Sequence, residues 1–484
     1  MDPFVGREQE RKILSEVFHS GRAELIAMYG RRRVGKTFLI EQFFSPLCPF
    51  FEITGSKEAH VREQLLNFSR IFSTFFCKGE YVKPPGSWND AFALLHEAIK
   101  KSEVQQRIVL FFDEVPWLSS KKSKFLAAFE YYWNRHFSKD KRIIMILCGS
   151  ASAWMVKRIV NNRGGLYGRL TRIMRLLPFK LNEAEEFLLA HNVELDRKQL
   201  VELYMAVGGI PQYLGMVKRG MSATAAINDL FFQPNAPLYP EFDRVFRSLF
   251  DQHQSYVDII RALASKKSGL TKIELLKAAK LTSGGGSSTM LKELQECGFI
   301  AYLPHYGAKK SKGRYVLIDE YCLFYIVWVE SVQKITPASL DEDYWFKIQR
   351  SQSWKAWAGY AFESICIKHI QQIKRSLGIA GVSTTESEWS WNPPKKSKEK
   401  GAQIDLIIER MDRCTNLIEM KFIEGPFTIN KAYSEELKYK KNLFREKTGT
   451  PHALFTTLLT TQGIQKNMHS LSVVDAEITV DALF

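Results

Sequence analysis

Residues 24–43 read ELIAMYGRRRVGKTFLIEQF. The first six letters are a short apolar run that is typical of a buried strand, and the last six favour a helix. Between them, Gly30 and Gly35 let the backbone curl so that its N–H groups face one point. The start of the following helix adds partial positive charge at the same place. The stretch therefore predicts a loop that binds phosphate.

The loop has the G-x-x-x-x-G-K-T spacing of a Walker A motif, in the strand and helix context that this motif requires. We expect Lys36 to reach the β- and γ-phosphates of ATP and Thr37 to place its hydroxyl on Mg²⁺. The alternative is a glycine turn with a chance lysine, and the flanking elements argue against it. The predicted nucleotide-binding residues are Gly30, Arg31, Arg32, Arg33, Val34, Gly35, Lys36, Thr37 and Phe38.

Two further apolar runs end in residues that suit ATP chemistry. Residues 107–112 predict a buried strand that ends in Asp113 and Glu114. Because strand ends of parallel sheets point at the ligand crevice, we expect Asp113 to hold Mg²⁺ and Glu114 to activate the attacking water. Residues 143–148 predict another strand, followed by Ser150, which is either a sensor of the γ-phosphate or an ordinary serine at a strand end.

Phosphoryl transfer also needs positive charge on the transition state. Arg169 is the candidate arginine finger and Arg163 is its rival, although either could be a solvated surface charge.

Composition supports a soluble protein with a polyanionic partner. The chain has 484 residues, 45% of them apolar and 25% charged, with a formal net charge of +16. That charge favours DNA over a membrane as the partner. The 7 cysteines form no Cys-x-x-Cys pair, which suits the cytoplasm. No apolar run approaches the ~20 residues of a membrane helix, and the N-terminus does not resemble a signal peptide.

Several of these segments together resemble the archaeal ATPase family, a branch of the STAND and AAA+ P-loop proteins near the Orc/Cdc6 initiators. The resemblance is carried by residues 4–8 (FVGRE), the loop at 29–37, Asp113-Glu114 and residues 148–150 (CGS). Residues 208–211 (GGIP) resemble the Gly-Gly-x-Pro segment of the family's helical lid, which implies that Pro211 lies near the nucleotide. The resemblance implies an α/β multidomain protein with a P-loop parallel sheet at 1–180 and a helical lid at 181–252.

Residues 253–335 have the pattern of a winged helix-turn-helix. Helices are expected at 256–264, at 271–279 with Thr271 as N-cap, and at 287–297 with Ser287 or Ser288 as N-cap after a glycine turn at 284–286. Strands are expected at 298–302 and 314–318. The domain either contacts DNA phosphates or only packs on the ATPase core. The candidate contacts are Lys292, Lys309, Lys310, Lys312 and Arg314.

Residues 336–484 resemble a PD-(D/E)xK nuclease domain of the DUF234 type. A long helix is expected at 354–373, an irregular stretch at 387–402, and strands at 403–408, 417–422 and 451–455. Glu419 and Lys421 share one face of a strand, and Asp405 lies on its neighbour. The resemblance implies that Asp405 and Glu419 bind Mg²⁺, that Lys421 acts in cleavage, and that Glu363 is a fourth member. The usual proline before Asp405 is missing.

A helix at 432–447 carries further basic residues that either contact a phosphate backbone or form a solvated face. They are Lys438, Lys440, Lys441 and Arg445, and the lysines of the preceding irregular stretch are Lys395, Lys396, Lys398 and Lys400.

The sequence thus favours an ATP-hydrolysing, Mg²⁺-dependent enzyme that binds and cleaves DNA. One alternative is a STAND-type nucleotide switch whose nuclease-like domain binds DNA without cutting it. Another is an Orc-like initiator, which would leave the last domain unexplained. Assembly into a homo-oligomer is also compatible with the family.

Overall fold

The computed structural model describes residues 4–120, 122–162, 164–250, 252–266, 268–307, 313–332, 341–394 and 399–484. Arg163 and the lysines at 309, 310, 312, 395, 396 and 398 lie outside these ranges. The chain forms two compact units, Met1–Pro178 with Ser248–Asp251, and Phe179–Arg247 with Gln252–Phe484. The expected domain boundaries at 180, 252 and 335 stay predictions.

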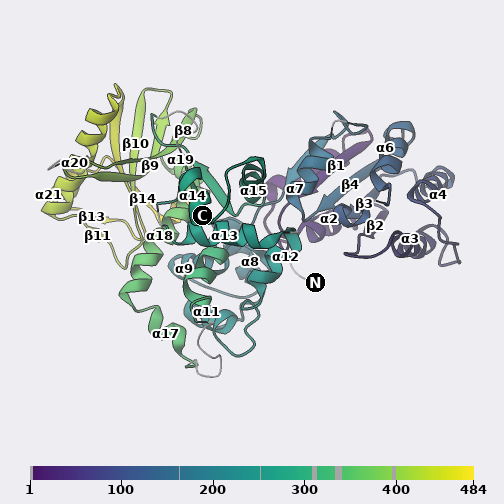
Figure 1. Ribbon diagram of the computed structural model, residues 1–484, viewed down its shortest axis with the longest axis horizontal. Coiled ribbons are helices and arrows are strands. Elements are labelled where there is room, and N and C mark those ends of the chain that lie inside the picture. Colours follow the sequence, from purple (N-terminus) through teal and green to yellow (C-terminus); the bar gives the residue numbers. More distant parts are fainter. Residues whose placement is uncertain are drawn as a thin grey trace. The chain divides into compact units, whose positions relative to one another are not determined.

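The first unit contains a five-stranded sheet in the order β2-β3-β4-β1-β5, with every neighbouring pair parallel (Figure 1). Strands β1, β3 and β4 are buried along their whole length, as the apolar runs predict. Because β4 lies between β1 and β3, the ends of all three strands reach the same edge of the sheet. The strands are β1 (Glu24–Tyr29), β2 (Phe50–Thr54), β3 (Ile108–Asp113), β4 (Ile143–Gly149) and β5 (Arg172–Arg175).

An aromatic core joins this sheet to its helices. Phe112 of β3 packs against Phe92 and Phe125 at ring-centroid distances of 5.7 and 5.8 Å, and Trp88 meets Phe125 edge-on at 4.9 Å. All four side chains are buried, so the core fixes β3 and with it the residues at the end of β3. The helices are α1 (Glu8–Phe18), α2 (Lys36–Phe44), α3 (Val61–Phe76), α4 (Trp88–Lys101), α5 (Val115–Leu118), α6 (Phe125–Arg135) and α7 (Ser152–Met155).

The second unit begins with helices, and their role as a lid stays a prediction. Tyr204 of α9 is fully buried and its hydroxyl donates to Phe179 O at 2.6 Å. A Cβ on Gly209 would lie 1.9 Å from Phe179 O, so only glycine permits this close approach of two backbone segments. The helices of this part are α8 (Leu181–Ala190), α9 (Arg197–Val207), α10 (Pro211–Leu214), α11 (Ala223–Phe231) and α12 (Glu241–Leu249).

Three helices and an antiparallel hairpin follow, in the order expected for a winged helix. Thr271 caps the second helix by accepting from Glu274 N, as predicted. The prediction for the third helix was wrong at its start, because this helix begins at Gly285 with Gly284 as N-cap. The Ser287 hydroxyl instead accepts from Gly284 N at 3.1 Å, inside the first turn. The elements are α13 (His253–Ala264), α14 (Lys272–Ala278), α15 (Gly285–Glu296), β6 (Ile300–Leu303), β7 (Arg314–Leu317) and α16 (Glu320–Phe324).

A second five-stranded sheet, in the order β14-β12-β10-β9-β8, forms the last part of the unit. Strands β8, β9 and β10 are antiparallel neighbours, and β12 and β14 add to them in parallel. The irregular stretch expected from 387 was placed too early, because β8 runs on to Trp391. The strands are β8 (Thr384–Trp391), β9 (Ala402–Arg410), β10 (Cys414–Lys421), β12 (Ala453–Thr460) and β14 (Ala476–Thr479).

The single helix predicted at 354–373 is in fact two helices that meet at His369. The His369 ring is fully buried, and its Nε2 accepts from Leu181 N at 3.1 Å. Helix α20 packs along β9 and β12 (Figure 1). The remaining elements are α17 (Tyr344–Ile348), α18 (Gln352–Lys368), α19 (Ile370–Ser376), α20 (Lys431–Thr448), α21 (Met468–Leu471), β11 (Phe427–Thr428) and β13 (Ile464–Gln465).

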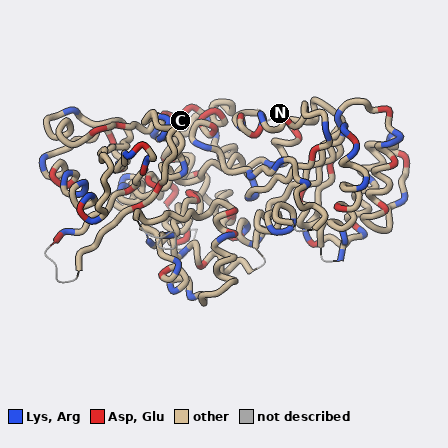
Figure 2. The backbone as a smooth tube through the Cα atoms, turned by 90° about the horizontal axis from the view of Figure 1, so that it is seen from above, with Lys and Arg blue, Asp and Glu red and all other residues tan. Residues whose placement is uncertain are grey.

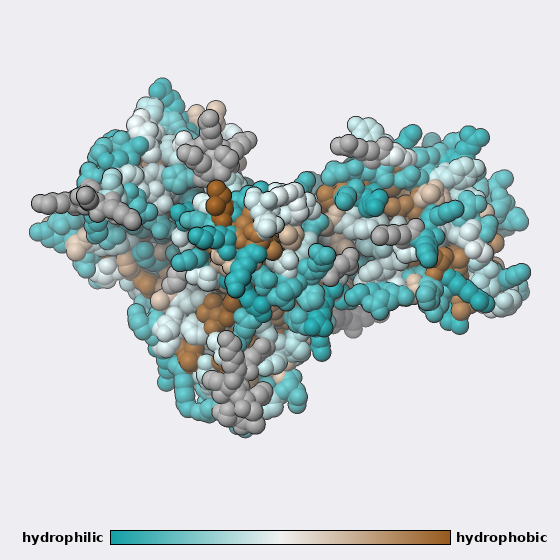
Figure 3. Space-filling model, in the orientation of Figure 1, coloured by the Kyte–Doolittle hydropathy of each residue, from teal (hydrophilic) through white to brown (hydrophobic). Residues whose placement is uncertain are grey.

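The face drawn in Figure 3 is largely hydrophilic, with hydrophobic residues in separate small areas. Across the described residues, no helix combines the length and the apolar character needed to span a bilayer.

Candidate functional site

The loop between β1 and α2 has the backbone that its glycines predict. Gly35 and Arg33 have left-handed φ angles of 85° and 71°. A Cβ on Gly30 would lie 2.2 Å from Leu176 O, so this position accepts only glycine. Helix α2 begins at Lys36, with Gly35 as its N-cap. The loop therefore ends where free N–H groups at the start of a helix can receive an anion.

Lys36 lies on the inner side of this loop. Its Nζ donates to Gly30 O at 2.9 Å, to Arg31 O at 3.0 Å and to Ser150 Oγ at 3.0 Å. The side chain is buried, at 6% exposure. The ammonium group is thus held at the mouth of the loop, where the phosphates of a nucleotide are expected.

Thr37 and Asp113 meet beside the same loop. The Thr37 hydroxyl donates to Asp113 Oδ2 at 2.6 Å, and Asp113 Oδ1 accepts from Glu114 N at 2.8 Å. A hydroxyl and a carboxylate in contact are the oxygen ligands that Mg²⁺ prefers. The pair therefore fits the metal role that the sequence predicts for both residues.

Glu114 and Ser150 bring the ends of β3 and β4 together. Ser150 N donates to Glu114 Oε2 at 3.1 Å, and the Ser150 hydroxyl bonds the other oxygen of the same carboxylate. Glu114 has a left-handed φ of 48°, which turns it out of the line of β3. Ser150 thus contacts both Lys36 and Glu114 and links the loop after β1 to the end of β3.

A second cluster lies on β9 and β10. Ile418 pairs with Leu406 in the antiparallel register, which sets Glu419 opposite Asp405 on one face of the sheet. Asp405 Oδ2 accepts from Met420 N at 3.0 Å. Glu419 is buried, at 3% exposure, and its Oε1 has no hydrogen-bond partner among the described residues. Burial and the neighbouring Asp405 raise the pKa of Glu419 to about 7.

Two lysines approach the Glu419 carboxylate. Lys440 Nζ of α20 lies 2.8 Å from Glu419 Oε2, and Lys421 Nζ lies 3.8 Å from the same oxygen. Lys440 was expected either to contact a phosphate backbone or to lie on a solvated basic face, and both expectations were wrong because it pairs with Glu419 inside its own unit. Lys441 is also engaged, with its Nζ 3.0 Å from Asp475 Oδ2. Of the basic residues predicted on this helix, Lys438 and Arg445 remain exposed.

Glu363 lies on α18. Burial chiefly, and then the charges of Glu363 and Asp405, raise the pKa of the Cys366 thiol on the same helix. Within the described ranges, no three His, Cys, Asp or Glu side chains converge as a metal site. The cluster therefore offers Asp405 and Glu419 as its paired carboxylates.

Residues 4–217 match the family described as "ATPase domain predominantly from Archaea". This part of the chain is an archaeal-type ATPase domain. An uncharacterized protein of Methanocaldococcus jannaschii is 26% identical over 423 residues, which are 87% of each chain.

Two solved structures are similar to about two thirds of the chain. A Walker-type ATPase of Pyrococcus abyssi has a TM-score of 0.50 and 20% identity, over 67% of this chain and 96% of that one. The Aeropyrum pernix ORC2 protein has a TM-score of 0.44 and 15% identity, over 70% and 97%. The similarity to the Pyrococcus abyssi structure confirms the α/β fold with a parallel central sheet.

The archaeal-type ATPase domain also uses a residue whose role the sequence did not indicate. Arg7 is buried, and its guanidinium donates to Leu177 O at 2.8 Å and to Val34 O at 2.9 Å. Arg7 thus ties the segment after β5 to the phosphate-binding loop. Its only sequence signal was its place in the FVGRE stretch.

The positions of the remaining predicted site residues do not by themselves indicate a role. The guanidinium of Arg32 lies 5.8 Å from the Trp117 ring centroid, and Arg31 and Val34 are buried. Arg169 is exposed, which is compatible with an arginine finger and equally with a solvated charge. Pro211 belongs to the second unit, where it opens α10. The finger and the nucleotide contact of Pro211 therefore stay predictions.

Proposed function

We propose that the archaeal-type ATPase domain binds and hydrolyses ATP at the loop from Gly30 to Thr37. The contact chain from Lys36 through Ser150 to Glu114 carries this proposal, because it brings an ammonium group and a carboxylate together at the ends of β3 and β4. Thr37 and Asp113 would hold Mg²⁺, which neutralises phosphate charge when bound. Glu114 would accept the proton of the attacking water, and Ser150 would fix the direction of its carboxylate.

We also propose that residues 336–484 are a PD-(D/E)xK-like nuclease domain that cleaves DNA with Mg²⁺. The order of α18, three antiparallel strands, α20 and the parallel strand β12 supports this proposal. The buried Glu419 opposite Asp405 carries it, since two adjacent carboxylates stay ionised together only beside positive charge. Asp405 and Glu419 would hold the metal, and Lys421 would orient the attacking water. Glu363 would act from α18.

One observation favours the alternative, a STAND-type switch whose nuclease-like domain binds DNA without cutting it. Lys440 already supplies a positive charge 2.8 Å from Glu419 Oε2. An ion pair of this kind can satisfy a buried carboxylate without a metal. The two candidates differ in whether a divalent cation displaces Lys440 from Glu419.

DNA binding is proposed for the second unit, through the winged-helix region at 253–335 and the basic face of α20. The net charge of +16 and the exposed Lys292 and Lys438 support it. The helical lid at 181–252, a cytoplasmic location and a homo-oligomer belong to the same proposal.

A single cleavage assay tests these alternatives. The full chain is incubated with plasmid and short duplex DNA, with and without ATP and Mg²⁺, beside the variants Asp405→Ala and Lys36→Ala. Metal-dependent cleavage that Asp405→Ala abolishes, while ATP hydrolysis continues, supports the nuclease. DNA binding that responds to ATP without any cleavage supports the switch.

A further inference from the structure

The two lysines beside Glu419 are held in different ways. Lys440 Nζ donates to Glu419 Oε2 at 2.8 Å and also lies 3.7 Å from Glu436 Oε1. Lys421 Nζ lies 3.8 Å from Glu419 Oε2, and its ammonium group forms no hydrogen bond with a described residue. Lys440 is therefore the counter-ion of Glu419. Because a lysine side chain is a flexible stem, the Lys421 ammonium needs a further contact to keep its place.

An aromatic ring of α20 supplies that contact. Lys421 Nζ lies over the Tyr433 ring, 5.6 Å from its centroid. The electron-rich face of an aromatic ring attracts a cation, and the attraction grows as water is excluded. The Lys421 side chain is 31% exposed, so most of it is shielded from solvent. The Tyr433 ring and the Glu419 carboxylate thus approach the same ammonium group.

The start of α20 fixes the position of this ring. Asn430 is the N-cap of the helix, and its side chain accepts from Tyr433 N at 2.9 Å. Phe427 of β11 meets the Tyr433 ring edge-on, at a centroid distance of 5.3 Å. Tyr433 also packs against a small core that contains the buried Ile429 and Leu437. The cap and the core together hold the ring still, as a contact that positions another side chain requires.

The ring of Tyr433, and not its hydroxyl, accounts for the contact with Lys421. The hydroxyl oxygen is buried and has no hydrogen-bond partner among the described residues. Phenylalanine at this position would keep the ring and remove only the unpartnered hydroxyl. Leucine would keep apolar volume and remove the ring. The two substitutions therefore separate a role of the ring from other roles of the side chain.

From these contacts we propose that Tyr433 is a positioning residue of the nuclease-like site, whose ring holds the Lys421 ammonium beside Glu419. The inference rests on the nuclease proposed above, and it adds a member on α20 to the set of Asp405, Glu419 and Lys421. Because Lys440 pairs with Glu419, Lys421 stays available to orient the attacking water. Tyr433 acts through Lys421 and touches neither the substrate nor the metal.

The placement of Lys421 is tested without DNA or metal. The full chain is labelled with ¹³C at the ε-carbon of lysine and studied in EDTA by heteronuclear NMR, and Lys421→Arg identifies the Lys421 signal by its loss. Protons over the face of an aromatic ring are shifted upfield. We expect the Lys421 signal to lie upfield of the signals of exposed lysines and to stay there in Tyr433→Phe. In Tyr433→Leu it should move to the position of exposed lysines.

Tyr439→Leu is the matched control, because it removes a partly buried tyrosine ring from the same helix. The Tyr439 hydroxyl donates to Lys400 O, and its ring packs against the core that contains Phe444. This substitution should leave the Lys421 signal unchanged even where it lowers the stability of the chain.

Cleavage of duplex DNA gives the second readout. Tyr433→Leu should lower the rate at saturating DNA and Mg²⁺ about tenfold, which corresponds to the loss of a partly desolvated cation–π contact. DNA affinity in EDTA should stay within about twofold. Tyr433→Phe should keep the rate within about twofold of the unmodified chain, and Tyr439→Leu should show no tenfold loss. Misplacement of Lys421 predicts a lower rate at unchanged affinity, whereas general unfolding would lower both.

An unchanged Lys421 signal in Tyr433→Leu overturns the proposal, as does a Tyr433→Phe variant that loses the signal or the rate to the same extent. Failure of the nuclease is a separate result. A chain that never cuts DNA refutes the nuclease, while the Lys421 signal still decides whether Tyr433 holds this lysine. A chain that cuts DNA equally well with Tyr433→Leu refutes the role of Tyr433 alone.

Discussion

At Lys36, one ammonium group connects both ends of the phosphate-binding loop to β4. It donates to Gly30 O, Arg31 O and Ser150 Oγ, and bound ATP would exchange part of this set for phosphate oxygens. Because charge-assisted bonds contribute about 1.5–3 kcal/mol each, Lys36→Ala should weaken ATP binding about 100-fold or more in calorimetry. The exposed Lys12→Ala on α1 serves as control. Equal ATP affinity in Lys36→Ala and in the unmodified chain would refute the assignment.

Glu114 differs from Lys36 in that it should act on water and not on the nucleotide. Glu114→Gln keeps both the shape of the side chain and an oxygen for Ser150, but it cannot accept a proton. We expect ATP to bind with nearly unchanged affinity while the hydrolysis rate falls by about 10²–10⁴. Phosphate release and nucleotide retention on one sample separate the two effects, and undiminished turnover would assign the base elsewhere.

Glu419 should make stability depend on pH. The folded protein keeps this proton up to about pH 7, whereas the unfolded chain releases it near 4.5. The folded state therefore binds more protons between these values, and the free energy of unfolding falls as the pH rises through them, by at most about 1.4 kcal/mol per pH unit. Glu419→Gln should flatten this decline in denaturant titrations at pH 5 to 8.

The response to divalent cations at Glu419 distinguishes the proposed nuclease from the proposed nucleotide switch. If Asp405 and Glu419 hold Mg²⁺, adding it at pH 8 should stabilise the unmodified chain more than Glu419→Gln, which keeps only the site proposed at Thr37 and Asp113. A Mg²⁺ response that is equal in both proteins would favour the Lys440 ion pair as the lasting partner of Glu419.

At the scale of elements, the sequence predicted those strands and helix ends that depend on residues close together in the chain. The apolar runs gave β1, β3, β4, β9 and β10, and the Thr271 cap placed α14, because these signals lie within a few residues. The break between α18 and α19 was missed, since it depends on a buried contact between His369 and Leu181. The inward orientation of Lys440 was missed for the same reason, because Glu419 is 21 residues away in the sequence.

The contact of His369 at the break between α18 and α19 should contribute to the free energy of unfolding. His369 Nε2 accepts from Leu181 N at 3.1 Å, and its Nδ1 donates to Ile365 O at 2.8 Å. His369→Ala leaves a buried N–H without an acceptor and opens a cavity, so we expect the free energy of unfolding to fall by about 2–4 kcal/mol. His253→Ala is the control, with a loss of less than about 0.5 kcal/mol.

The same histidine should add to acid sensitivity. Burial lowers the pKa of His369 to about 3, below the ordinary value of 6.5. The folded state therefore binds fewer protons than the unfolded chain between these values. Its contribution to stability is complete above about pH 6.5 and is lost as the pH falls toward 3. His369→Ala should accordingly show a weaker loss of stability on acidification than the unmodified chain, and an identical acid profile would contradict a neutral buried ring.

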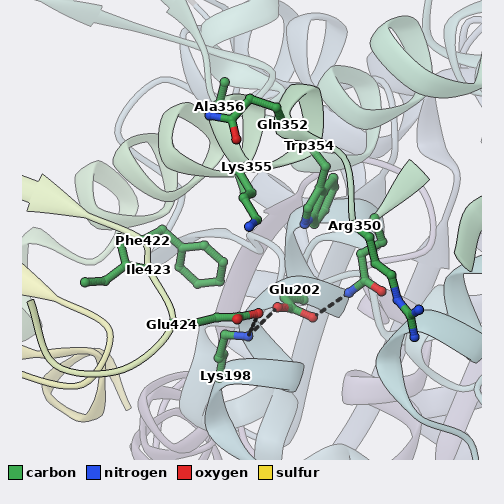
Figure 4. Close-up of a pocket in the computed structure, with 12 residues that line it drawn as sticks. Lys198, Glu202, Arg350, Gln352, Trp354, Lys355, Ala356, Phe422, Ile423 and Glu424 are labelled. Carbon is green, nitrogen blue, oxygen red and sulfur yellow. Dashed lines mark hydrogen bonds and ion pairs between the residues drawn. The ribbon is translucent and has the colours of Figure 1, made fainter. Parts of the chain in front are cut away.

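At the scale of the molecule, the charge surplus is not gathered in one place. Lys and Arg recur along the chain in both units, with Asp and Glu between them (Figure 2). Some lysines that were predicted for the basic surface form ion pairs within the second unit. Lys440 pairs with Glu419, and Lys441 pairs with Asp475. The carboxylates of these pairs are already counted in the net charge of +16, so the pairs leave that value unchanged but reduce the number of lysines on α20 that a polyanion can reach. A pocket of the second unit could not be predicted from the sequence, since its walls, α9, residues 349–358 and residues 422–424, meet only in the folded chain (Figure 4).

DNA binding, if it occurs through the second unit, should follow from the remaining exposed cations. Lys292 is exposed on α15, the third helix of the winged-helix region. Each phosphate contact contributes about −0.9 to the slope of log K against log salt, so Lys292→Ala should make the slope about one unit shallower on any duplex sequence. Lys438→Ala on α20 should also make the slope shallower if that face contacts the DNA backbone, whereas Lys12→Ala should not.

Fluorescence anisotropy with one labelled duplex at several salt concentrations measures the slope for the unmodified chain and for each of the three variants. A steep slope that none of the lysine variants changes would place the DNA contacts elsewhere, and a flat slope would argue against phosphate binding by this chain.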